Sequence, residues 1–260
     1  MTTEAQIRRD VPIPYYYQLI QVLQDAIERG VWPADTLIPS EHELCATYGV
    51  SRTVVRQALG ELADHGVLYR VKGRGTFVAP RKVEEHFVQR THGFYFDMTS
   101  RGHTVETRVI GREIVLPPPR VRDQLQLDDQ EHTITFKRVR SVDGAVLLYV
   151  QSYLPLQLCP ALADVDLSNG SLYEELQELC GLTVATGTRF VEAIPARAPI
   201  TTLLNVGRGT PLLKIESVSF LSDGRPLEYY EAWHRGDRTK IEIEIMPNEG
   251  ASAALIFPHR

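Results

Sequence analysis

The chain has 260 residues, of which 43% are apolar and 23% charged, and its formal net charge is −5. This composition is that of an ordinary soluble globular protein, long enough for two modest domains. Because no stretch approaches the roughly 18 apolar residues of a membrane span and the N-terminus lacks a signal-peptide core, we expect a cytoplasmic protein without a membrane partner.

The cysteines give no sign of a disulfide framework or of a metal site. Cys45, Cys159 and Cys180 are widely spaced, without a CxxC motif and without histidines at ligand spacing. Such spacing favours inert thiols. We therefore expect no metal and no cofactor.

The N-terminal part begins with a predicted helix. Residues 1–12 carry no periodic signal, and Pro14 suits a helix start. Apolar residues then keep helical spacing over residues 15–29, until Gly30 ends the pattern. We expect the next two helices to pack against this one.

Two shorter helices are predicted next. Ser40 and Glu43 have the spacing of a capping box, in which each side chain satisfies a backbone amide of the other residue. Gly49 ends this helix because it lacks a Cβ and allows a sharp reversal. Ser51 then caps a second helix that runs to about residue 65.

The helix that begins after Ser51 has two chemically different faces. Its apolar stripe, at positions i, i+3, i+4 and i+7, consists of Val55, Ala58, Leu59 and Leu62. Its opposite face is cationic and hydrogen-bonding, and consists of Arg52, Thr53, Arg56, Gln57 and Gly60. A helix of this kind fits a DNA major groove, where its N-terminal residues reach base edges and phosphates.

A β-hairpin with a basic tip is predicted after this helix. Its strands fall at about residues 67–71 and 76–79, and its tip is Lys72-Gly73-Arg74-Gly75. A narrow arginine flanked by glycines can enter a minor groove or lie on phosphates. Residues 51–82 contain seven arginines and lysines against two acids, so a local cationic surface is expected on an acidic chain.

A linker and a second domain are predicted to follow. Residues 81–90 are polar and aperiodic, which predicts a linker between a first domain at 1–80 and a second at 91–260. The second domain reads as a mainly antiparallel sheet with helices, an α+β fold. Strands are expected at 105–115, 132–140, 146–153, 184–194, 211–221, 227–233 and 241–245, with Asp-Gly turns at 143–144 and 223–224.

One strand of the second domain carries a candidate anion site. With a period of two, Arg138 and Arg140 lie on the same face as Ile134 and Phe136, which are apolar. Two arginines one pleat apart can clamp a phosphate or carboxylate, although such pairs are more often solvated or salt-bridged. Ser171, which caps a helix where free amides favour an anion, is a second candidate.

The motifs together resemble a known family. The run PSEHEL…YGVSRTVVRQAL…LYRVKGRGTFV resembles the winged helix-turn-helix of GntR-type bacterial transcription factors, and the rest resembles the UTRA ligand-binding domain of the HutC subfamily, which has the fold of chorismate lyase. The resemblance implies DNA-binding roles for His42, where the family commonly has arginine, and for Ser51, Arg52, Thr53, Arg56, Gln57, Lys72, Gly73, Arg74 and Gly75.

The resemblance also implies an effector site in the second domain. Its residues are His92, Gly93, Phe94, Arg138, Arg140, Ser171, Tyr173, Glu228 and His234. His234 stands where sugar-phosphate sensors tend to have tyrosine, and Val150 where many members carry glutamate. These departures favour an effector other than the usual amino-sugar phosphate, such as a smaller phosphate or a carboxylate like urocanate.

The expected function is that of a homodimeric transcriptional regulator, usually a repressor, which binds a palindromic operator in double-stranded DNA and responds to a small anion. The alternative is an enzyme of the chorismate-lyase fold acting on a small anionic substrate. We expect no enzyme, because the sequence offers no Ser-His-Asp set, metal cluster or Gly-rich phosphate loop at a useful spacing. A structural nucleoid protein is disfavoured by the arginine pair.

Overall fold

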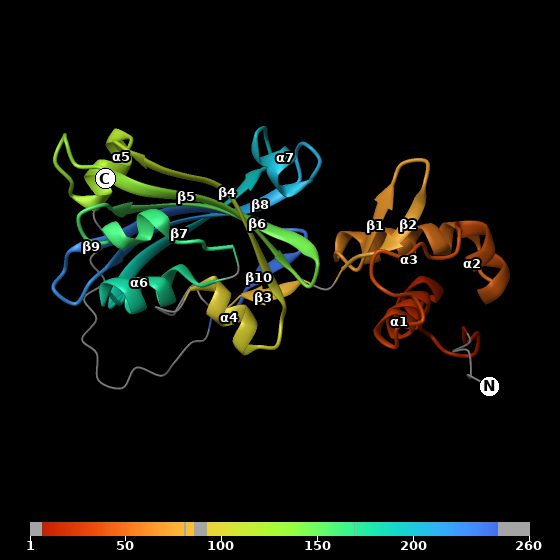
Figure 1. Cartoon of the computed structure of the whole chain (residues 1–260). Coiled ribbons are helices and arrows are strands. Elements are labelled where there is room, and N and C mark those ends of the chain that lie inside the picture. Colours follow the sequence, from red (N-terminus) through yellow and green to blue (C-terminus); the bar gives the residue numbers. More distant parts are fainter. Residues whose placement is uncertain (1–6, 81, 86–92, 169, 244–260) are drawn as a thin grey trace, which may run out of the picture. The chain divides into compact units, whose positions relative to one another are not determined.

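The computed structural model describes residues 7–80, 82–85, 93–168 and 170–243, which divide into two compact units with the boundary between Lys82 and Val83 (Figure 1). The first unit is helical with a small hairpin, and the second is built on a six-stranded antiparallel sheet with helices. This is the predicted α+β architecture. None of the described helices is long and apolar enough to cross a membrane.

The N-terminal unit has the predicted helices, and the capping box is present. The Ser40 hydroxyl accepts a hydrogen bond from the Glu43 amide at 3.3 Å, and the Glu43 carboxylate accepts one from the Ser40 amide at 2.7 Å. Gly49 adopts φ 64°, the left-handed conformation that ends the helix. The elements are α1 (Tyr15–Glu28), α2 (Glu41–Tyr48), α3 (Arg52–Asp64), β1 (Leu68–Val71) and β2 (Gly75–Val78).

An apolar core fixes the orientation of α3. The predicted stripe is buried, and it consists of Val55, Ala58, Leu59 and Leu62. It packs against leucines from the other helices and the hairpin, namely Leu19, Leu23, Leu44 and Leu68. Burying each large apolar side chain contributes about 1.5–3 kcal/mol. Because this stripe is held inside, the polar face of α3 is turned to solvent.

The C-terminal unit contains a twisted antiparallel sheet with the strand order β4-β5-β6-β9-β8-β7. Both predicted Asp-Gly turns are present, with Gly144 at φ 78° and Gly224 at φ 86°. Gly111 marks a register shift between β4 and β5. The strands are β4 (Val105–Val115), β5 (Thr133–Val142), β6 (Ala145–Pro155), β7 (Thr186–Pro195), β8 (Pro211–Phe220) and β9 (Pro226–Arg235).

Helices cover both faces of this sheet. Figure 1 shows α4 and α6 on one face and α5 and α7 on the other. Leu176 of α6 and Ile134 of β5 belong to one apolar cluster, and Phe94 and Met98 of α4 belong to another. The helices are α4 (Phe94–Ser100), α5 (Pro119–Leu125), α6 (Leu172–Cys180) and α7 (Ile200–Leu204), with a 3-10 helix η2 (Pro160–Asp164).

The structure differs from the predicted linker at 81–90. Residues Val83–Glu85 form strand β3, which pairs in parallel with β10 (Thr239–Ile241) and belongs to the second unit. The pattern was missed because the strand is only three residues long and its partner lies far along the chain. The last predicted strand, 241–245, is also wrong in part, because β10 ends at Ile241 and Ile243 is 62% exposed.

Candidate functional site

The polar face of α3 is exposed as predicted. Arg52, Thr53, Arg56 and Gln57 are all exposed, on the side of the helix away from the buried stripe. The Arg56 guanidinium is therefore available to a phosphate or a base edge, whereas Gln57 donates a hydrogen bond to Glu61 at 3.2 Å. This arrangement is that of a helix presented to a DNA groove.

The N-terminus of α3 is ordered by its own side chains and by α2. The Ser51 hydroxyl accepts a hydrogen bond from the Val54 amide at 3.4 Å, which caps the helix. Arg52 pairs with Glu41 at 3.1 Å, yet its side chain remains 79% exposed. An exposed pair contributes about 0–1 kcal/mol, so a DNA phosphate can replace Glu41 at small cost.

The tip of the hairpin is narrow and basic. Gly73 and Gly75 have φ values of 76° and 118°, which only glycine adopts without strain. Arg74 lies over the ring of Phe77, with its guanidinium carbon 5.7 Å from the ring centroid. The Phe77 ring in turn stacks on Tyr69. The aromatic pair thus supports the base of the tip, while the charged end of Arg74 stays in solvent.

All ten predicted DNA-binding residues are exposed on the N-terminal unit. They are His42 on α2, Ser51 and the four polar residues Arg52, Thr53, Arg56 and Gln57 at the start of α3, and Lys72, Gly73, Arg74 and Gly75 at the hairpin tip. The structure therefore places them where a nucleic acid can reach them. Sequence reasoning did not anticipate the Arg52–Glu41 pair.

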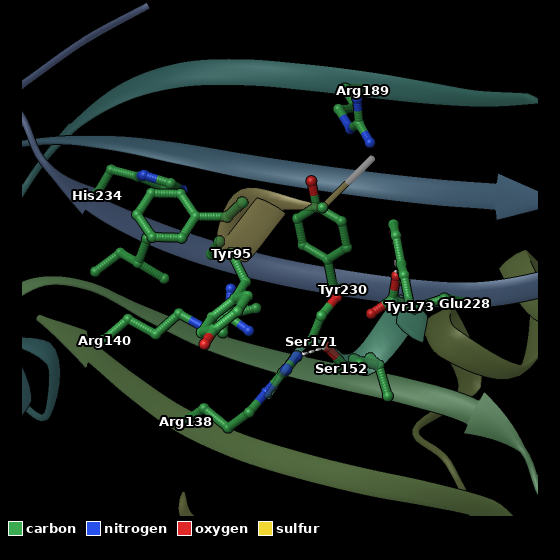
Figure 2. A pocket seen from close by; sticks show the side chains of 16 residues that line it. Tyr95, Arg138, Arg140, Ser152, Ser171, Tyr173, Arg189, Glu228, Tyr230 and His234 are labelled. Carbon is green, nitrogen blue, oxygen red and sulfur yellow. Dashed lines mark hydrogen bonds between the residues drawn. The ribbon is translucent and has the colours of Figure 1, made fainter. Parts of the chain in front are cut away.

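A pocket lies on one face of the large sheet, beneath α4 and the start of α6 (Figure 2). The structure brings eight of the predicted effector residues to its lining: Gly93, Phe94, Arg138, Arg140, Ser171, Tyr173, Glu228 and His234. The ninth, His92, lies outside the described residues. Side chains from one face of β5, from one face of β9 and from the start of α6 thus line the same cavity.

Arg138 and Arg140 reach into this pocket from β5 and are only 3% and 5% exposed. Arg138 donates a hydrogen bond to Ser152 at 2.9 Å, and Arg140 lies over the rings of Phe94 and Tyr95. Within the described part of the chain, Nε and Nη1 of Arg138 and Nε of Arg140 are buried without a hydrogen-bond partner. Both arginines are therefore almost fully buried, and neither forms a salt bridge with another described residue, whereas the sequence had left solvated or salt-bridged arginines as alternatives.

Burial lowers the pKa of both guanidinium groups. It lowers the pKa of Arg138, and burial together with the neighbouring Arg138 charge lowers the pKa of Arg140 to about 9. Removing a charge from water costs free energy unless a partner compensates for it. An anion placed between the two arginines would supply that partner.

Glu228, which also lines the pocket, is hydrogen-bonded to a tyrosine. Tyr173 donates a hydrogen bond to the Glu228 carboxylate at 2.7 Å and lies 3.4 Å from the Ser219 hydroxyl. Burial, and next the Glu228 charge, raise the pKa of Tyr173 well above its ordinary value. The phenol is therefore a neutral hydrogen-bonding group at physiological pH.

Four polar lining residues were missed by the sequence reasoning: Tyr95, Ser152, Arg189 and Tyr230. Ser152 and Tyr230 follow the alternation of β6 and β9, so the strand pattern contained that signal. Arg189 comes from β7, beyond Tyr230 as seen from Arg138 (Figure 2). Most residues of this edge strand are exposed, so its sequence gave no sign of an inward side chain.

His234 lines the pocket, and its ring contacts Glu85, which is not a lining residue. Its Nδ1 lies 2.9 Å from Oε1 of Glu85, and both side chains are almost fully buried. The ring also meets Phe94 edge to face, with centroids 6.1 Å apart. Glu85 was not a predicted site residue, because it fell in the expected linker.

One unit presents a helix to a DNA groove, and the other contains a buried cationic pocket. This combination is typical of ligand-responsive DNA-binding proteins. Residues 15–78 match the family model described as bacterial regulatory proteins, gntR family, and residues 100–240 match the UTRA domain. The chain belongs to the gntR family of transcriptional regulators, and its second unit is a UTRA effector-binding domain. The predicted family and the predicted DNA-binding regulatory function are confirmed.

Relatives with the same organisation support this assignment. The chain is 31% identical to the HTH-type transcriptional repressor NagR of Bacillus subtilis, over 89% of this chain and 95% of that protein. It is 27% identical to the HTH-type transcriptional regulator GmuR of the same organism, over 85% and 94%. The crystal structure of PhnF from Mycobacterium smegmatis has the same fold, with a TM-score of 0.63 and 23% identity over 87% of this chain and 99% of that one.

Proposed function

We propose that the pocket binds a small anionic metabolite and that Arg138 and Arg140 form the clamp for its anionic group. The observation that carries the proposal is the burial of two neighbouring guanidinium groups with unpartnered nitrogens. Bidentate hydrogen bonds from arginine suit the oxygens of phosphate and carboxylate. Ser152, which accepts a hydrogen bond from Arg138, and Ser171 also line the pocket, and their hydroxyls can donate to an anion.

The charge balance of the pocket favours a phosphate monoester over a monocarboxylate. Among the described residues that line the pocket, three are arginines and one, Glu228, is an acid, which leaves two positive charges in excess. His234 is paired separately with Glu85. A phosphate monoester carries about −1.5 to −2 charges at pH 7. A carboxylate remains the alternative anion.

The protein, in this proposal, is a cytoplasmic repressor that acts as a homodimer. In the homodimer, the two copies of α3 would bind the two half-sites of a palindromic operator, which lie about one helical turn apart. The ligand changes operator affinity without being consumed. Its relative NagR is named a repressor, which supports this direction of regulation.

The test is a pair of binding measurements on the full-length protein. A DNA duplex is first selected from a random library by the wild-type protein. Thermal melts with glucose 6-phosphate, inorganic phosphate, urocanate and neutral glucose then rank the ligands, and a compound at about 1,000 times its Kd stabilises by about 4 kcal/mol. A melt shift with neutral glucose equal to that with glucose 6-phosphate would contradict the anion clamp. Recovery of the compound unchanged separates binding from catalysis.

A further inference from the structure

A buried carboxylate stands directly behind the pocket wall. Glu85, the last residue of β3, is 0% exposed, and its Oε1 lies 2.9 Å from Nδ1 of His234. When Nδ1 carries the ring proton, it donates a hydrogen bond to an ionised carboxylate, which only accepts. The Thr239 hydroxyl donates a second hydrogen bond to the same oxygen, at 3.3 Å. Clamping an anion at Arg138 and Arg140 does not require this group.

The contact is directional and costly to disturb. Within the described residues, Oε2 of Glu85 has no hydrogen-bond partner, so the carboxylate depends on His234 and Thr239. Removing one partner of a buried polar pair leaves the other desolvated and unpaired. The stability of β3 in its observed position therefore depends on the position of the His234 ring, which is part of the pocket wall.

Strand β3 is also the first element after the DNA-binding unit. The boundary between the units falls between Lys82 and Val83, the residue with which β3 begins. The amide of Val83 donates to the Arg238 carbonyl at 2.7 Å, and the Val83 side chain packs in the cluster that contains Phe94 of α4. Val83 is thus held by α4, which borders the pocket, and by the turn between β9 and β10.

We propose that Glu85 is a positioning residue that couples occupancy of the pocket to the DNA-binding unit. A ligand that changes the position of the His234 ring changes the contact with Glu85, and with it the position of β3, which leads directly into that unit. The proposal rests on the proposed function of the pocket as an anion site. Packed interfaces respond to small displacements by switching between discrete arrangements, so a short rigid contact of this kind suffices.

The test compares coupling, not binding alone. The full-length protein is titrated with its selected duplex, with and without glucose 6-phosphate, and glucose 6-phosphate binding is measured by calorimetry. In the wild type the ligand should change DNA affinity by roughly 5–150-fold, the usual range of allosteric coupling. In Glu85→Gln both separate affinities should stay near the wild-type values, while the ligand effect on DNA affinity shrinks toward onefold.

Two further variants make the test decisive. Glu84→Gln is the matched control, because Glu84 is on the same strand but pairs with Arg101 and Lys240 with its side chain 31% exposed; it should keep wild-type coupling. Glu85→Asp keeps the charge and shortens the side chain, so it tests the contact if Glu85→Gln does not fold. Coupling should fall in this variant too.

The outcomes separate the two proposals. Wild-type coupling in a folded Glu85→Gln or Glu85→Asp protein would overturn the role of Glu85, as would an equal loss of coupling in Glu84→Gln. A wild-type protein that binds its duplex but shows no calorimetric binding of glucose 6-phosphate, phosphate or urocanate would instead contradict the anion site itself.

Discussion

Replacing Arg138 by methionine separates a ligand-binding role from a structural one, because the two predict opposite effects on stability. The wild-type side chain is 3% exposed, with two nitrogens unpartnered and a like charge beside it. Methionine has a similar length and no charge. It removes one hydrogen bond to Ser152, of 2.9 Å, which contributes about 0.5–1.5 kcal/mol.

Without ligand, we expect the removal of the buried charge to outweigh the loss of the hydrogen bond in its effect on stability. Removing a buried charge without a salt-bridge partner relieves its desolvation cost. When a whole buried ion pair is replaced by apolar side chains, the result is often neutral or stabilising, by about 1–4 kcal/mol. After the hydrogen bond to Ser152 is subtracted, we expect a free energy of unfolding that is unchanged or about 1–3 kcal/mol higher than in the wild type. A side chain kept for stability would give a decrease instead.

The effect on ligand binding has the opposite sign. A bidentate contact to a phosphate comprises two charge-assisted hydrogen bonds of about 1.5–3 kcal/mol each. Arg138→Met should therefore weaken glucose 6-phosphate binding by about 3–6 kcal/mol, or roughly 10²- to 10⁴-fold. At millimolar ligand the thermal shift seen in the wild type should vanish.

The assay is denaturant unfolding and thermal melting with and without glucose 6-phosphate. Lys137→Met is the matched control, because Lys137 is adjacent on β5, points to the opposite face and pairs with Glu113 at 3.3 Å. It should keep the ligand-induced shift. The reasoning would be refuted by an Arg138→Met protein that is less stable than the wild type and still shifts with glucose 6-phosphate.

Three further predictions follow from the same contacts. Affinity for glucose 6-phosphate should fall as pH rises above the Arg140 pKa of about 9, because the guanidinium loses its charge there while phosphate, with its second pKa of about 6, stays dianionic; calorimetry showing constant affinity from about pH 8 to 10 would contradict this. Arg56→Ala should weaken binding of the selected duplex by about 1–3 kcal/mol with an unchanged melting temperature, since the side chain is exposed; an unaltered mobility-shift titration would count against α3 as the reading helix. Ser40→Ala should lower the free energy of unfolding by about 1 kcal/mol through loss of the cap, and a urea midpoint equal to that of the wild type would show that the cap contributes nothing.

The N-terminal unit could be predicted almost completely because its signals are local. The capping box at Ser40, the glycine at position 49 and the apolar stripe of α3 each act within a few residues. Local physics of this kind is readable from one sequence. The Arg52–Glu41 pair was not readable, because it joins two helices across their turn.

The second unit was predictable in its strands and not in their order. Alternation and Asp-Gly turns indicated β5, β6, β8 and β9, but the pairing of β6 with β9 joins segments that are distant in sequence. Strand β3 was not predicted for the same reason, because its partner β10 begins at Thr239, far along the chain. Sequence periodicity fixes which face a residue shares and leaves open which strand lies beside it.

The same limit explains which pocket residues were found. Arg138 and Arg140 share a face by a period of two within one strand, so their proximity followed from the sequence. Arg189 and Glu85 enter the pocket region from an edge strand and from the short β3, whose patterns carry no inward signal. These two are brought in by tertiary pairing alone.

The guanidinium nitrogens of Arg138 and Arg140 that lack hydrogen-bond partners among the described residues also bear on the proposed switch. A ligand shifts a conformational equilibrium only by its difference in affinity for the two states. A buried guanidinium is compensated when an anion is present and uncompensated when it is absent, so anion binding carries most of the available difference at Arg138 and Arg140. A neutral sugar that fills the same space leaves that cost in place. In the proposed mechanism, we therefore expect the charge of the ligand, and not its shape alone, to supply the free energy that changes DNA affinity.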